Sequence, residues 1–208
     1  MAAERETGKE GAPEIIRVVM GFPHLCSSSP ASLTVWRKSL LFHGNGYTVF
    51  DNSSGKMVFR VDNYSHNWRE ETFLMDVQGN VLITIRRCRK RLSIMDTWEA
   101  YKGDRNASEQ EKPLFKATKA LGNPSCKISM AEGNADKAFN YRIDWSRQNG
   151  WSKIYRTSSS YLPVAEVRRK NGTRPYALYG KDVLTMCVQP GVDQALVMAM
   201  VMVNDAMR

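Results

Sequence analysis

Residues 194–203 read Gln-Ala-Leu-Val-Met-Ala-Met-Val-Met-Val, a run with one polar side chain and no charge. Asp193 stands just before it, where a helix N-cap is expected, and Pro190-Gly191 ends the segment before that. The run therefore predicts a helix that is apolar on every side and must be buried on every side. A helix of about a dozen residues is roughly 18 Å long, whereas the hydrocarbon core of a bilayer is roughly 30 Å thick. We therefore predict a helix buried in the protein core and not a membrane span or anchor.

The segment before this run, from about residue 33 to residue 188, consists of short runs of β-forming residues separated by turns. The odd-numbered residues of 57–61 and of 141–145 are apolar, which is typical of strands with one face turned inward. Asp96 interrupts the apolar face of a longer strand predicted over residues 92–101, and it marks a bulge or an opening there. Glycine-containing turns are predicted at Gly44-Asn45-Gly46, Ser53-Ser54-Gly55, Gln78-Gly79-Asn80, Asn149-Gly150 and Asn171-Gly172.

About a dozen strands of this kind can close around one helix, so the sequence predicts a mostly β fold with the apolar C-terminal helix at its centre. The chain has 208 residues, a length that fits one domain with a large core. Residues 1–14 have almost nothing to bury and predict a flexible tail. We expect a single domain over residues 15–208 and a monomer.

The four cysteines, Cys26, Cys88, Cys126 and Cys187, lie tens of residues apart with no CxxC pair, which argues against a zinc site. The N-terminus lacks the basic start and apolar run of a secretory signal peptide. We therefore expect reduced thiols and a cytoplasmic protein, with the nucleus and the periphery of the plasma membrane as alternative locations.

The sequence contains no pattern that predicts catalysis. Only His24, His43 and His66 are available as the commonest general base, and each stands in a polar or turn segment without a supporting motif. No phosphate-binding loop and no dinucleotide-binding fingerprint occurs. We expect a protein that is not an enzyme and has no cofactor and no metal.

The strongest local signal is a basic cluster between two predicted strands, which we call the first basic cluster. It holds five positive charges in six residues: Arg86, Arg87, Arg89, Lys90 and Arg91. A second basic cluster precedes and follows the turn at residues 171–172 and comprises Arg168, Arg169, Lys170 and Arg174. If the two clusters share one end of the fold, they form one anion site.

The net charge of +9 agrees with an anionic partner but does not identify it. Clusters of this kind attract anionic phospholipid head groups, phosphoinositides among them, or the phosphates of a nucleic acid. The alternative is a solvated basic edge that prevents strands from aggregating. No specific nucleic-acid motif accompanies the clusters.

Several stretches are similar to the plant LURP-one-related family. They are residues 33–51, Leu-Thr-Val-Trp-Arg-Lys-Ser-Leu-Leu-Phe-His-Gly-Asn-Gly-Tyr-Thr-Val-Phe-Asp; residues 55–64; residues 76–87, Asp-Val-Gln-Gly-Asn-Val-Leu-Ile-Thr-Ile-Arg-Arg; and residues 92–103. With the final apolar helix, the resemblance extends over residues 13–207. It implies membership of the superfamily of tubby C-terminal domains and phospholipid scramblases, and hence a closed, twelve-stranded antiparallel barrel around a central C-terminal helix.

The resemblance also implies functions. Tubby domains bind phosphatidylinositol bisphosphate through basic residues, some act as membrane-tethered transcriptional regulators, and the plant family is linked to pathogen defence. No motif of this chain aligns with the lipid-contacting residues of tubby. Our first hypothesis is therefore a non-enzymatic, peripheral module for anionic lipid that uses the two basic clusters. The alternative is an adaptor for an unidentified protein partner, or a tubby-type transcriptional regulator.

Overall fold

The structure is a computed structural model, and it describes residues 21–38, 45–62, 70–88, 95–104, 112–120, 122–131, 140–146, 148, 150–157, 159–170 and 182–207. The tail predicted over residues 1–14 lies outside these ranges, so the domain boundary at residue 15 stays a prediction.

The described chain forms twelve strands, one α-helix and one short 3-10 helix. The strands are β1 Ala31–Lys38, β2 Asn45–Asp51, β3 Met57–Asp62, β4 Glu71–Met75, β5 Val81–Arg87, β6 Met95–Lys102, β7 Phe115–Ala120, β8 Ser125–Met130, β9 Asn140–Ser146, β10 Trp151–Arg156, β11 Ser159–Arg169 and β12 Val183–Val188. The helices are η1 Pro23–Leu25 and α1 Gln194–Ala206.

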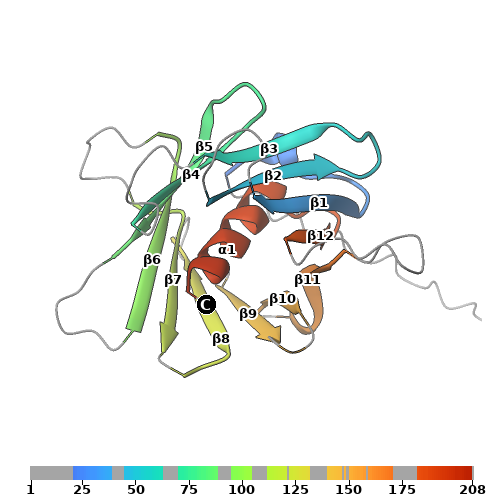
Figure 1. The fold of residues 1–208 in the computed structure, drawn as a ribbon. Coiled ribbons are helices and arrows are strands. Elements are labelled where there is room, and N and C mark those ends of the chain that lie inside the picture. Colours follow the sequence, from blue (N-terminus) through green and yellow to red (C-terminus); the bar gives the residue numbers. More distant parts are fainter. Residues whose placement is uncertain are drawn as a thin grey trace, which may run out of the picture.

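The strands form one closed barrel in which every strand is antiparallel to both neighbours, and Figure 1 shows α1 inside it. Consecutive strands pair along the chain, and β1 closes the ring against β12, with Ala31 opposite Val188 and Trp36 opposite Val183. The fold predicted from the sequence is therefore confirmed.

Alternation along the strands builds the core as the sequence predicts. Phe59 and Val61 on β3 are buried, as are Tyr141, Ile143 and Trp145 on β9. One predicted turn is wrong, because Asn45 and Gly46 belong to β2, where Asn45 pairs with Lys38. The longer strand predicted from residue 92 is described only from Met95, and residues 92 and 94 lie outside the described ranges.

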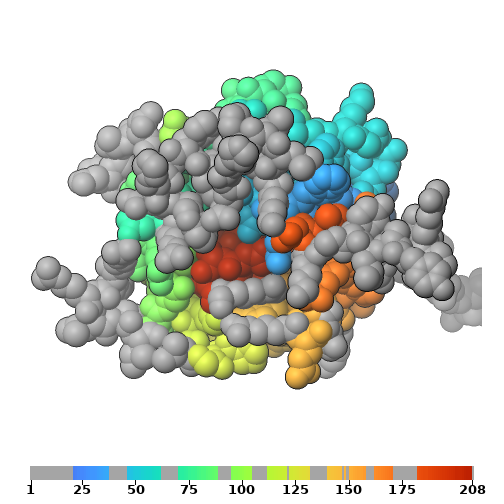
Figure 2. All heavy atoms as spheres, viewed as in Figure 1, coloured from blue at the N-terminus to red at the C-terminus, as the bar shows by residue number. Residues whose placement is uncertain are grey.

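The helix α1 runs for 13 residues, and the ten residues from Ala195 to Asn204 are all buried. Asp193 is its N-cap, as predicted, and accepts hydrogen bonds from the backbone N–H groups of Ala195 and Leu196. Of the helices in the described part of the chain, none has the length and apolar composition that crossing a bilayer requires. The helix is instead enclosed by strands, and part of its surface is visible at the centre of the molecule in Figure 2.

The N-terminal part of α1 is tied to the segment before β1. The backbone N–H of Phe22 donates to Oδ2 of Asp193 at 2.9 Å, and Cys26 forms a backbone bridge with Asp193. Phe22 itself is buried against the core. These contacts place the segment around η1 at the end of the barrel where α1 begins.

The C-terminal end of α1 lies at the opposite end of the barrel. Asp205 accepts hydrogen bonds from Arg37, near the end of β1, at 2.9 Å and from Tyr47, near the start of β2, at 3.1 Å. The carbonyl oxygen of Met207 accepts a hydrogen bond from Nζ of Lys119, near the end of β7, at 2.6 Å. This is the end where odd-numbered strands end and even-numbered strands begin, and we call it the rim.

Candidate anion-binding site

The described residues of both basic clusters lie at the rim, because the strands that carry them run in the same direction. The first cluster follows β5 and the second follows β11, and alternate strands of a closed antiparallel barrel are parallel to one another. The loops after β5 and β11 therefore leave the same end of the barrel, which is also where α1 ends.

The two clusters nevertheless lie on opposite walls. In the ring, β5 and β11 are six strands apart in either direction. With strands about 4.8 Å apart and tilted by about 40°, a barrel of this size is roughly 25 Å across. The structure thus brings the clusters to one end but not into one small pocket.

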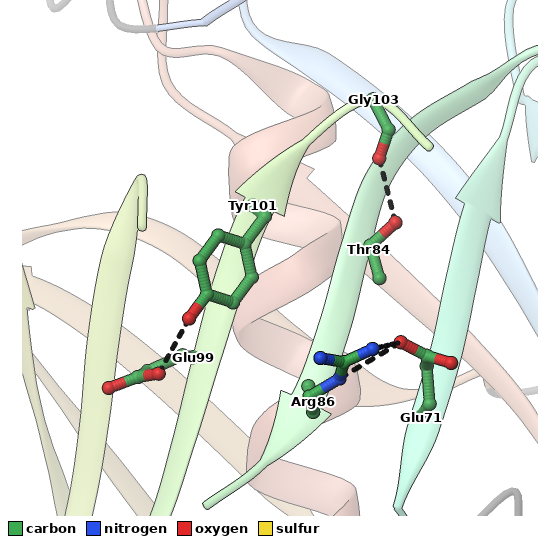
Figure 3. Close-up of polar contacts among 6 residues, drawn as sticks. All are labelled: Glu71, Thr84, Arg86, Glu99, Tyr101 and Gly103. Carbon is green, nitrogen blue, oxygen red and sulfur yellow. Dashed lines mark hydrogen bonds and ion pairs between the residues drawn. The ribbon is translucent and has the colours of Figure 1, made fainter. Parts of the chain in front are cut away.

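Arg86 is on the outer face of β5 and is held by an acidic neighbour. Its Nε and Nη2 atoms both donate to Oε1 of Glu71 on β4, at 3.0 and 2.6 Å (Figure 3). On its other side it stands directly opposite Glu99 of β6, whose carboxylate accepts the Tyr101 hydroxyl at 2.7 Å. An anion that binds Arg86 must therefore compete with a carboxylate already in place.

Arg87 is also paired. Its Nε donates to Oδ1 of Asp96 on β6 at 3.0 Å, and the two side chains are 39% and 25% exposed. The interruption that the sequence shows at Asp96 is thus the acidic half of an ion pair at the rim end of β6. The remaining residues of the first cluster, Arg89, Lys90 and Arg91, lie outside the described ranges.

The three described members of the second cluster have different surroundings. Arg168 donates to Oε2 of Glu166 at 2.7 Å, and this bond raises the pKa of Arg168 and lowers that of Glu166. Lys170 donates through Nζ to the Thr34 hydroxyl of β1 at 2.6 Å. Arg169 is exposed, and its side chain lies over the turn at Gly150, where an added Cβ would be 2.7 Å from its Nε. The fourth member, Arg174, lies outside the described ranges.

Two further cations at the rim, Arg37 and Lys119, were not predicted from the sequence. The helix α1 has no basic residue in its last turn, although its carbonyl end favours a nearby cation. The barrel supplies these cations: Arg37 pairs with Asp205 and Lys119 binds the Met207 carbonyl, across 168 and 88 residues of sequence. Contacts this distant leave no local sequence signal.

The described residues offer little chemistry of other kinds. No three His, Cys, Asp or Glu side chains within them come together as a metal site would need. His24 lies exposed in η1, while His43 and His66 are outside the described ranges. The four cysteines are free thiols; burial raises the pKa of Cys126 to about 12, and Cys187 is exposed.

Comparison with known proteins gives consistent results. The family model described as LURP-one-related matches residues 31–205. Among curated relatives, the chain is 37% identical over 184 residues to LURP-one-related protein 8 of Arabidopsis thaliana, covering 88% of this chain and 90% of that protein. It is 32% identical over 206 residues to LURP-one-related protein 12 of the same plant, covering 97% of this chain and 89% of that protein.

The fold is also found among solved structures. The crystal structure of an Arabidopsis thaliana protein superposes with a TM-score of 0.64 at 19% sequence identity, covering 91% of this chain and 98% of that one. At this identity the likeness bears on the fold alone.

Proposed function

The chain belongs to the LURP-one-related family, and from that premise we propose that it is a non-enzymatic module that associates with anionic membrane surfaces through the rim of its barrel. The observation that supports this most is the placement of the two basic clusters at one end of the barrel but on opposite walls. A single inositol phosphate head group is too small to bridge walls roughly 25 Å apart. A lipid surface across the rim reaches both clusters at once.

The clusters attract such a surface through many weak contacts and not through one pocket. Each Lys or Arg near an anionic leaflet contributes about 1 kcal/mol, and two groups of cations on one rigid barrel act together. Arg86 and Arg87 already have carboxylate partners, so we expect each to contribute less than Arg169, which makes no ion pair within the described part of the chain.

The test is co-sedimentation of the full chain with phosphatidylcholine vesicles, with and without phosphatidylinositol bisphosphate. We expect clearly greater recovery with the anionic lipid and a loss of that gain at high salt, because counterions screen exposed charges. Equal recovery with both kinds of vesicle overturns the proposal.

Variants separate contact with a surface from binding in one pocket. Reversing Arg89 and Lys90 to Glu weakens the first cluster, and reversing Arg169 to Glu weakens the second. If both clusters touch the membrane, each variant lowers recovery and the combination abolishes it. Loss from one variant alone, with no effect of the other, contradicts the two-cluster surface.

The biological setting is part of the same proposal. A cytoplasmic protein held at the membrane periphery, acting in pathogen defence, agrees with the family and with the likeness to tubby domains suggested by the sequence. Transcriptional regulation after release from the membrane is the tubby-type alternative. A role as an adaptor for another protein needs a surface outside the rim.

A further inference from the structure

The outer face of β8, β9, β10 and β11 has a charge pattern unlike that of the neighbouring wall. Among its described outward-facing side chains are four cations and two carboxylates: Lys127, Arg142, Lys153, Arg168, Asp144 and Glu166. We call this face the basic wall. It runs down the side of the barrel from Arg168, which it shares with the second basic cluster, so its other charges face a different direction from the rim.

The neighbouring wall is a useful contrast, because its charges neutralise one another. Glu71, Arg86, Glu99 and Lys116 are directly opposite one another on β4, β5, β6 and β7, so that the sign alternates at every step. Alternating charges on adjacent strands stabilise a sheet. A row of this kind needs no external partner.

The basic wall keeps this alternation at Asp144, Lys153 and Glu166, which are directly opposite one another on β9, β10 and β11, but it breaks the rule at its β8 side. Lys127 of β8 stands directly opposite Arg142 of β9, and both side chains are exposed. Like charges in this position destabilise a sheet. Arg142 is drawn toward Asp144, at 3.0 Å, whereas Lys127 makes no side-chain hydrogen bond or ion pair within the described part of the chain. A local cost of this kind is expected where a surface serves binding.

Two aromatic rings of β10 contact cations of the wall. Nζ of Lys153 is 5.3 Å from the centre of the Trp151 ring, and the Arg142 guanidinium is 5.3 Å from the centre of the Tyr155 ring. Cation–π contacts hold both cations against the wall in fixed positions. Each cation also occupies one face of its ring, where a base of a single-stranded nucleic acid would otherwise stack.

We infer that the basic wall binds an acidic peptide segment of a partner protein. The four cations and two carboxylates of the wall leave a surplus of two positive charges, so its internal ion pairs, such as those of Lys153 and Arg168 with Glu166 at 3.7 and 2.7 Å, do not neutralise it. From β8 to β11 there are three strand spacings, about 14 Å, which an extended peptide crosses in about five residues. Asp and Glu side chains of such a peptide would compensate Lys127 and Arg142.

The test measures the fluorescence anisotropy of a labelled Asp/Glu decapeptide titrated with the full chain, in parallel with a single-stranded DNA oligonucleotide and with phosphatidylserine vesicles. The wall variant carries Lys127→Glu with Arg142→Glu. The matched control carries Lys56→Glu with Lys112→Glu, which changes the net charge equally at two exposed positions away from the wall. We expect the wall variant to weaken peptide binding about tenfold or more and the control to change it less than about threefold.

The single variant Lys127→Glu adds a second measurement, the melting temperature, whose expected rise a change in net charge alone does not explain. Lys127→Glu places opposite charges on the two strands, so it should raise the melting temperature by roughly 1–3 °C while weakening peptide binding. Equal weakening by the wall variant and its control overturns the inference, as does binding that survives the wall variant. Loss of oligonucleotide or vesicle binding with peptide binding unchanged overturns it in favour of those ligands.

Different variants test peptide binding at the basic wall and lipid binding at the rim, so one can be disproved without the other. The rim variants at Arg89, Lys90 and Arg169 should leave peptide binding intact, and the wall variant should leave the gain from phosphatidylinositol bisphosphate intact.

Discussion

Asp193 links the segment around Phe22 to the first turn of α1, at the end of the barrel where the helix begins. Its buried carboxylate accepts three backbone N–H groups, from Phe22, Ala195 and Leu196, at 2.9, 2.9 and 3.1 Å. Burial raises the pKa of this group above its ordinary value, because the charged form loses hydration that the three donors only partly replace.

Replacing Asp193 by Ala leaves these donors without an acceptor. We expect a loss of about 2–4 kcal/mol in the free energy of unfolding, measured by urea titration. Asp193→Ser is the matched control, because a hydroxyl still caps the helix but is too short to reach Phe22. Its loss should be intermediate, and equal losses for both variants would contradict the link to Phe22.

Asp51 governs part of the acid sensitivity. Hydrogen bonds from Ser53 and Ser54 lower its pKa from 3.8 to about 2. Because the folded state favours the charged form, this contribution to stability is present above pH 3.8 and is lost as the pH falls toward 2. Glu166, also lowered, acts in the same direction, whereas Asp193, raised, acts in the opposite one.

Melting temperatures measured between pH 5 and pH 2 should therefore fall most steeply near the bottom of this range. We expect Asp51→Asn to flatten the fall between pH 3.8 and 2, since the amide does not titrate. A profile parallel to that of the unchanged chain would show that the turn bonds of Asp51 contribute nothing.

At the scale of the element, α1 depends on close packing at every side. Most helices turn one side to solvent, but ten consecutive residues of α1 are buried. Met198, in the middle of the helix, is 0% exposed. Met198→Ala should cost about 2–4 kcal/mol through lost burial and a residual cavity. Met198→Leu, of similar volume, should cost less than about 1.5 kcal/mol by the same denaturant measurement. Equal losses of stability for these two variants would show that α1 accepts a smaller side chain at this position without a cavity.

The element scale is also where sequence reasoning is most reliable. The apolar run at 194–203 and the cap at Asp193 specify a buried helix through local chemistry alone. Alternation at 57–61 and 141–145 specifies strands and their inner faces in the same way. A turn residue is less certain, because Asn45 satisfies both turn chemistry and a strand end, and pairing with Lys38 decides the matter.

At the scale of the whole molecule, the strand count and the central helix are predictable, but positions around the ring are not. Whether the two basic clusters meet depends on which strands close the barrel, and the pairing of β1 with β12 places β5 and β11 six strands apart. The same holds for Arg37 and Lys119, whose partners are Asp205 near the end of α1 and its C-cap Met207. Such contacts follow from closure and have no local signature.

Removing residues 194–208 should unfold the domain, because all ten residues from Ala195 to Asn204 are buried inside the barrel. We expect the truncated chain to lose its cooperative thermal transition and to bind a hydrophobic dye, as loosely packed states do. A truncated chain that melts cooperatively would show that the strands need no helix. Full-length Met198→Leu serves as a folded reference.

The position of α1 after all twelve strands has a consequence for synthesis on the ribosome. Every strand leaves the exit tunnel before the segment that fills the space between them, and the final pairing of Ala31 with Val188 joins residues more than 150 positions apart. Inner strand faces such as Phe59 and Ile143 are thus translated long before they are covered. Folding must wait for the end of α1, and until then the nascent chain is a natural client for chaperones that bind exposed apolar strands.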